Sequence, residues 1–179
     1  MAEFLWIFWS FSLLGWVLER LFAVVTRSPR RRRRCLLLLP LCPVYGLGMA
    51  AVLALPPSLR SGWPLYIWGC LTATAVEYIY HWWGETFLGV SFWDYTGVFG
   101  NLRGRVCLPF SLAWGLLLFP AVYLVTPPVL ALADRVPVGV TWWMLLAFTA
   151  DAVCSLRFLA VTHDLEAMRA AVWPVSGDR

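Results

Sequence analysis

The sequence predicts an all-α, polytopic integral membrane protein with about five transmembrane helices, its N-terminus outside and its C-terminus cytoplasmic. Three observations indicate this class. Hydrophobic residues make up 61% of the 179 residues and charged residues only 13%, against about 25% charged in typical globular proteins. The 12 Trp suit aromatic belts at two membrane interfaces. Apolar runs of about 20 residues, enough to cross the hydrocarbon, recur along one membrane domain, residues 1–179.

The basic residues between the apolar runs predict the topology. Six Arg fall within residues 27–34, and a short loop this basic should stay cytoplasmic. The first run lacks the basic start and the cleavage site of a signal peptide, so it is expected to remain as a span. A cytoplasmic interfacial loop, residues 85–106, and a short C-terminal tail, residues 162–179, follow from this orientation. The expected location is the bacterial inner membrane, with spans near residues 4–25, 35–55, 63–84, 107–126 and 140–161.

Helix-breaking residues interrupt the second expected span. Pro40, Pro43, Gly46 and Gly48 lie within nine residues, around Tyr45. Broken helices inside membranes free backbone carbonyls and often line ion or substrate sites. Gly and Pro are also frequent in membrane helices that only pack. We therefore expect Pro43, Tyr45 and Gly46 to mark a broken helix, which either contributes to a site or simply kinks a packing helix.

Three carboxylates lie inside apolar runs, where an ionisable group costs roughly 2.5–3.5 kcal/mol on insertion scales. They are Glu19, Glu77 and Asp151. The helical rise places Glu19 and Glu77 about 10 Å inside the cytoplasmic boundary, and Arg157 approaches the same layer. Asp151 lies deeper, one helical turn from Ser155, and is expected to be protonated or bonded to another helix.

The third span carries a polar stripe. Its members follow spacings of four, three, four and four residues, so they share one helix face that should turn toward other helices or a wet cavity. A metal site, a proton relay and polar packing that fixes the helix register are all open, and polar packing is the simplest. The stripe is Cys70, Thr74, Glu77, His81 and Glu85; the wider candidate polar site is Glu19, Glu77, His81, Asp151 and Arg157.

The residue types also exclude several activities. The chain has no Lys, so it carries neither a Walker-type ATPase nor a Schiff-base lysine. The five Cys include no CxxC pair and are expected to be small apolar filler, with disulfides and a zinc site poorly supported. The basic residues follow the topology, which is not a nucleic-acid signal. No catalytic residue, cofactor or metal is assigned, and an enzyme is less expected than a protein without catalysis.

The most specific stretch runs from Glu77 to Leu108 and contains the segments 93–96 (WDYT) and 101–105 (NLRGR). With the segments 15–19 (GWVLE) and 43–48 (PVYGLG), it resembles the bacterial family known as putative ABC-transporter permeases, which is similar to the small transmembrane 229 proteins of animals. The resemblance covers roughly residues 4–120 and implies a small multi-pass transport protein, without implying a substrate. The recurrent pattern of the family falls on Glu19, Tyr45, Gly46, Glu77, Trp93, Asp94, Tyr95, Asn101, Gly104, Arg105 and Trp114.

The loop before the fourth span supplies a second set of candidates. Trp and Tyr side chains suit the headgroup layer, and Arg105 could bind a lipid phosphate through paired hydrogen bonds. A buried ion pair between Asp94 and Arg105 that locks the loop is the favoured alternative. The candidate interfacial or phosphate-contacting residues are Trp93, Asp94, Tyr95, Asn101, Arg103 and Arg105.

A transport component is the expected function, with a polar site toward the cytoplasmic leaflet. It would need a separate ATPase subunit, which could dock on the loop 85–106. Five spans are few for a permease, so a homo-oligomer or a second membrane subunit is expected, and membrane lipid is a further partner. The alternatives are a lipid-handling or lipid-modifying protein that uses Glu19, Glu77 and His81, and a noncatalytic assembly partner.

Overall fold

The computed structural model describes residues 1–26 and 35–172, which are mostly helical. The Arg-rich segment 27–34 and the end of the expected tail, residues 173–179, lie outside the described residues. Two elements, η2 and η3, are single π-helical turns. In chain order the elements are α1 (Ala2–Thr26), α2 (Pro43–Leu53), α3 (Gly62–Trp83), η2 (Gly84–Leu88), β1 (Asn101–Leu102), β2 (Val106–Cys107), α4 (Leu108–Pro120), η3 (Ala121–Val125), α5 (Thr126–Arg135), α6 (Val138–Thr162) and α7 (Leu165–Val172).

Within the described residues, three helices are long and apolar enough to cross a membrane: Ala2–Val25, Leu108–Arg135 and Val138–Thr162. The first and third of these lie at the first and fifth expected spans. The second extends beyond the expected 107–126, because the π-helical turn η3 joins α4 to α5 without a break. Pro120 has no N–H to donate to the preceding turn, and the hydroxyl of Thr126 donates to the Ala121 carbonyl at 2.8 Å.

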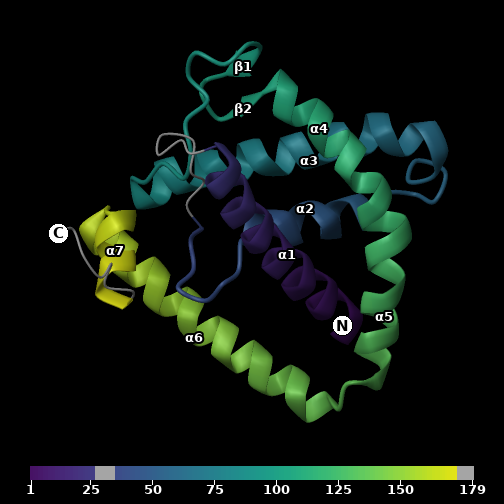
Figure 1. Cartoon of the computed structure of the whole chain (residues 1–179). Coiled ribbons are helices and arrows are strands. Elements are labelled where there is room, and N and C mark those ends of the chain that lie inside the picture. The colour runs from purple at the N-terminus through teal and green to yellow at the C-terminus, as the bar shows by residue number, and fades with distance from the viewer. Residues whose placement is uncertain (27–34, 173–179) are drawn as a thin grey trace.

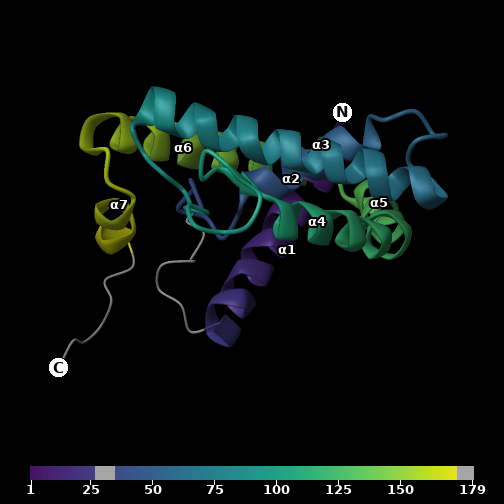
Figure 2. The same ribbon diagram turned by 90° about the horizontal axis from the view of Figure 1, so that it is seen from above.

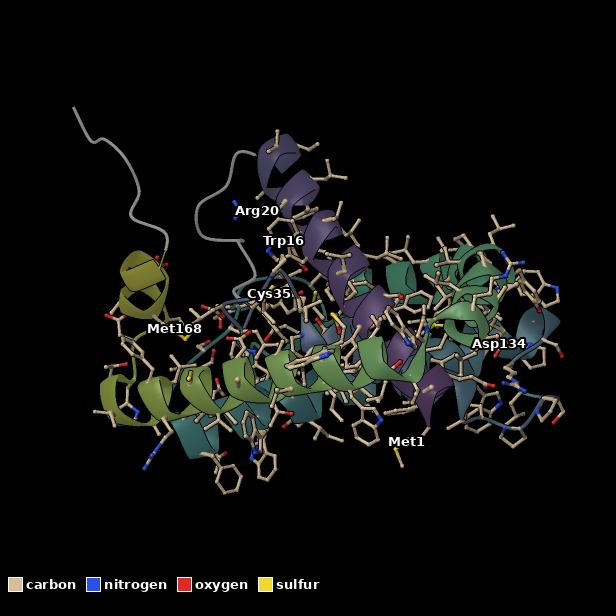
Figure 3. All side chains as sticks on the ribbon, turned by 90° about the horizontal axis from the view of Figure 1, so that it is seen from below. Met1, Trp16, Arg20, Cys35, Asp134 and Met168 are labelled. Carbon is tan, nitrogen blue, oxygen red and sulfur yellow. A yellow bond between two sulfur atoms is a disulfide. The ribbon has the colours of Figure 1, made fainter. Side chains whose placement is uncertain are left out.

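The helices enclose α1 on several sides. Figure 1 shows α1 crossing the middle of the molecule, with α3 and α4 on one side and α5 and α6 completing a frame. Seen from above, α3 and α6 lie in one layer, and the C-terminal half of α1 projects from it (Figure 2). Trp16 and Arg20 mark this projecting half (Figure 3), where the Arg20 guanidinium carbon lies 5.0 Å from the Trp16 ring centroid.

The second expected span is helical over only half its length. α2 has 11 residues and is about 16 Å long, whereas residues 36–40 form bends. Pro43 occupies the first turn of α2, where its missing N–H costs no hydrogen bond. Cys42 before it is extended, with φ −110° and ψ 92°, as expected of a residue that precedes proline.

Side chains from the long loop after α3 complete the larger apolar core. Phe92 is fully buried and Trp93 is 5% exposed, and both contact the ring of Tyr80. The same cluster includes Trp9 of α1 and Leu159 of α6. The two-stranded hairpin, in which Asn101 pairs with Cys107, ends this loop. The loop that was expected to be interfacial is therefore packed against α3 along much of its length.

Candidate functional site

Glu77 lies at the point where α3, α4 and the long loop meet. Its side chain is 2% exposed. The Tyr95 hydroxyl donates to one carboxylate oxygen at 3.2 Å, and the Trp114 indole N–H donates to the other at 2.9 Å. Buried polar groups are costly unless they are hydrogen-bonded, so these contacts explain how an apolar fold accommodates Glu77. They also join three segments that are distant in sequence.

The other predicted members of the stripe on α3 face the same side. The Cys70 thiol contacts the Ser111 carbonyl of α4 at 3.0 Å. His81 is 1% exposed, and its Nε2 lies 3.1 Å from the Glu85 carboxylate and 3.2 Å from the Ser91 hydroxyl. Of the five stripe residues, Glu77 and His81 are buried and the other three are half-buried, and their contacts turn this face of α3 toward α4 and the loop.

Two glycines allow α1 and α2 to approach closely. A Cβ atom at Gly15 would lie 2.2 Å from the Tyr45 ring, and one at Gly46 would lie 2.4 Å from the Phe8 carbonyl oxygen. The Tyr45 hydroxyl donates to the carboxylate of Glu19. The Tyr45 ring also makes an edge contact with the ring of Trp114, with 5.3 Å between centroids.

A pocket of about 340 Å³ opens between α1, α2, α3, α4 and η3. Its wall is apolar except at one end, where Tyr45, Glu77 and Trp114 lie. The helix α1 contributes Leu14 and Leu18 to the apolar part of the wall. Pockets of roughly 300–1,000 Å³ with mostly apolar walls and a few polar groups are typical of small-molecule sites. The arrangement can hold an apolar molecule beside one carboxylate.

Arg105 pairs with Glu85, so the predicted pair between Asp94 and Arg105 is wrong. Arg105 Nε donates to the Glu85 carboxylate at 2.7 Å, and its Nη1 donates to the Tyr78 hydroxyl at 2.8 Å. The Asp94 carboxylate instead accepts the Thr96 N–H at 2.7 Å. Hydrogen bonds from the side chain and then the backbone of Thr96 lower the pKa of Asp94. Asp94 thus stabilises a turn, as short polar side chains do in loops.

The remaining loop candidates hold the hairpin together. The Trp93 indole N–H donates to the Arg105 carbonyl at 2.7 Å. The Asn101 side-chain oxygen accepts the Gly104 N–H at 3.2 Å, and Gly104 has a φ of +70° that only glycine adopts without strain. Arg103 is exposed, also with positive φ. These residues, apart from Arg103, make contacts that fix the loop.

Asp151 and Arg157 lie apart from Glu77. The carboxylate of Asp151 accepts the backbone N–H groups of Leu38 and Leu39 at 3.2 and 2.9 Å, and the Ser155 hydroxyl at 3.0 Å. Asp151 is therefore bonded to the broken second span. The side chain of Arg157 is exposed. The structure thus separates Asp151 and Arg157 from Glu77, whereas Glu19 is connected to Glu77 through Tyr45 and Trp114.

Sequence reasoning missed two features. Cys35 and Cys42 form a disulfide that closes the bent segment before α2, so the view of all five cysteines as apolar filler is wrong for this pair. Their spacing of seven residues is no recognised motif, and only the bend between them brings the sulfurs together. The Tyr78–Arg105 contact was also missed, because Tyr78 has no distinctive sequence signal. Within residues 1–26 and 35–172, no group of three or more His, Cys, Asp or Glu side chains forms a metal site.

Several residues of the family pattern noted in the sequence lie close together around Glu77. Glu19, Tyr45, Glu77, Tyr95 and Trp114 are linked by the contacts just described. Comparison with curated proteins and with solved structures finds no match. The family described as "Putative ABC-transporter type IV" matches residues 6–156, which span every element that contributes to the pocket. This chain is therefore a membrane protein that belongs to the family of putative ABC-transporter type IV proteins.

Proposed function

We propose that this chain is the permease component of a transporter and that the pocket beside Glu77 handles the substrate. The observation that carries the proposal is the buried Glu77 carboxylate at the wall of an otherwise apolar pocket. An ionisable residue at membrane depth usually faces a protein interior or a cavity and often belongs to a substrate pathway. Membership of an ABC-transporter family supports the same function.

The proposed transporter draws its energy from a separate ATPase subunit, since the chain has no Lys for a Walker motif. The loop between α3 and α4 is the proposed contact. Its tip exposes Phe99 by 78% and Leu102 by 57%, next to the exposed Arg103. Many apolar side chains of α6 are also exposed, including Trp142 and Trp143. They would face lipid, a second membrane subunit or another copy of this chain.

Purification in mild detergent from the native membrane, followed by mass spectrometry, tests this proposal. A stoichiometric ATPase is the expected result, and its recovery should fall when Phe99, Leu102 and Arg103 are replaced by Ser. Replacement of Trp142, Trp143 and Leu146 on α6 by Ser is the matched control for loss of apolar surface, because all three are exposed. Purification of the folded chain without any ATPase, under conditions that preserve known transporter complexes, would contradict the proposal.

A lipid-handling protein is the second candidate, and the apolar wall of the pocket is the observation that favours it. In this case the first purification would recover a bound lipid and no ATPase. A noncatalytic assembly partner is distinguished by mutation. Replacement of both Glu19 and Glu77 by Gln would then leave the cellular phenotype unchanged, because neither carboxylate would contact a substrate.

A further inference from the structure

We infer that the pocket beside Glu77 binds one long apolar chain of a membrane amphiphile, which enters sideways from the bilayer. The inference rests on the proposed function only in using the same pocket. It names the class of molecule that the pocket takes, and it holds for a transport substrate or for a lipid that is merely bound.

The rim is apolar although it is exposed. Leu14, Leu18 and Leu21 of α1 are 45%, 38% and 59% exposed, and Leu117 of α4 is 44% exposed, yet all four line the pocket. In a bilayer such side chains contact acyl chains, because no water is present there to be excluded. A molecule entering between α1 and α4 therefore comes from the hydrocarbon, and an apolar chain crosses this rim without losing hydration.

The interior contains space that no side chain fills. Gly48 of α2 lines the pocket and is buried, but a Cβ atom built on it would have no atom within 4 Å. Gly15 and Gly46 differ from Gly48, because close helix packing leaves no room for a Cβ atom at either position. Val44 and Met49, both buried at 8% and 3% exposure, form the inner wall next to Gly48. The pocket therefore has room for a side chain, or for part of a bound molecule, against α2.

The polar end of the pocket orients the amphiphile. Glu77, the indole of Trp114 and the phenol of Tyr45 gather on one side of an otherwise apolar wall. A few placed polar groups in an apolar pocket typically fix the orientation of a bound molecule. The chain would therefore occupy the space between α1, α2 and η3, and its polar head would lie toward α3 and α4.

Photolabelling tests the inference directly. The purified chain is placed in phosphatidylcholine nanodiscs containing a long-chain alcohol with a terminal diazirine, irradiated, digested and mapped by mass spectrometry. We expect labelling at Val44 and Met49, which are buried and line the pocket. The variant Gly48→Leu fills the interior and should lower labelling of these two residues by at least about tenfold.

Gly139→Leu is the matched control, because Gly139 also has open space at its missing Cβ but is exposed and does not line the pocket. It should label like the parent. Ala73→Leu, which fills the pocket from α3, gives the same test if Gly48→Leu fails to fold. Labelling confined to outward-facing residues such as Leu47 and Leu116, or unchanged by both pocket-filling variants, would overturn the inference.

The outcome is independent of the ATPase, because the assay uses this chain alone. Recovery of an ATPase together with unlabelled pocket residues would overturn chain binding and leave the transport proposal standing. The reverse outcome is pocket labelling that Gly48→Leu blocks, with no ATPase purifying together with the chain. It would support chain binding and contradict transport. The two proposals can therefore fail separately.

Discussion

The Glu77 side chain combines a structural and a chemical role, and two substitutions separate them. Glu77→Ala leaves the Tyr95 hydroxyl and the Trp114 N–H without their acceptor, which should cost about 2 kcal/mol or more in unfolding free energy. Glu77→Gln should fold almost normally, because its amide oxygen can still accept from Trp114 and its NH₂ group can donate to the Tyr95 oxygen. Thermal unfolding in one detergent measures both effects.

The activity of the same variants tests whether Glu77 serves the substrate. Glu77→Gln should reduce substrate-stimulated ATP hydrolysis of the purified transporter more than Glu85→Gln does. Glu85 is 36% exposed, whereas Glu77 is 2% exposed at the pocket wall. Activity equal to the parent in both variants would restrict Glu77 to packing.

Two glycines, one at the α1–α2 contact and one beside open space, give a second residue-scale prediction. Gly15→Ala places a methyl group 2.2 Å from the Tyr45 ring, and overpacking of this kind typically costs about 1–3 kcal/mol. Gly48→Ala has open space and gains helix propensity, so it should be neutral or stabilising by up to about 1 kcal/mol. Comparing their melting temperatures with the parent measures the difference. A milder loss at Gly15 than at Gly48 would refute this account of the packing.

Some residue-scale features were accessible from the sequence and others were not. The spacing of Cys70, Glu77 and His81 predicted one shared face. The partners of those residues were not predictable, because they come from a loop whose path the periodicity does not define. The pairing of Arg105 with Glu85 is an example, because it depends on where the hairpin places Arg105 relative to α3 and η2.

At the scale of elements, Asp151 connects α6 to the bent segment before α2. Its carboxylate accepts the N–H groups of Leu38 and Leu39, which have no helix to bond them. Asp151→Ala should therefore free this segment, and Asp151→Asn should have a smaller effect because it keeps one acceptor oxygen. Loss of the acceptor for these otherwise unpaired backbone N–H groups costs about 1–3 kcal/mol, so amide exchange at Leu38 and Leu39 should accelerate by about 5- to 150-fold.

Hydrogen exchange followed by mass spectrometry provides this measurement. Asp134→Asn is a suitable control, because Asp134 is exposed at the end of α5. Its exchange over residues 36–41 should match that of the parent. Unchanged exchange in Asp151→Ala would show that the disulfide between Cys35 and Cys42 holds the segment without help from α6.

The second expected span shows which effects of helix-breaking residues can be predicted from sequence. Pro40 and Pro43 predicted that the second span would be broken, and α2 does begin at Pro43. Sequence could not say that the N-terminal part would be non-helical, because proline is compatible with either a kink or a helix start. The carboxylate that satisfies this segment lies 112 residues away from Leu39, beyond the reach of any local pattern.

At the scale of the whole molecule, the number of crossings depends on this second segment and on α3, which is not among the three candidate membrane-crossing helices of the described residues. The helix α2 alone, at about 16 Å, cannot cross a hydrocarbon layer of about 30 Å. The segment from Cys35 to Cys42 adds little to this length, because the disulfide holds its two end Cα atoms 5.0 Å apart. Irregular backbone is tolerated at membrane depth where the protein satisfies its polar groups, and here Asp151 and the Ser12 carbonyl do so, the latter at 2.9 Å from Cys42 N.

The sequence predicts five crossings, and reporter insertions can test this number. With five crossings, alkaline phosphatase inserted near residue 59 or residue 136 should be active, because both loops would lie outside. Fluorescent protein should fold in the cytoplasm when inserted near residue 97 or fused after residue 172. If the segment 35–53 instead enters and leaves on one side, the second crossing is lost. Every reporter after it would then change sides relative to the N-terminus, so activity of phosphatase at residue 97 and not at residue 59 would establish four crossings.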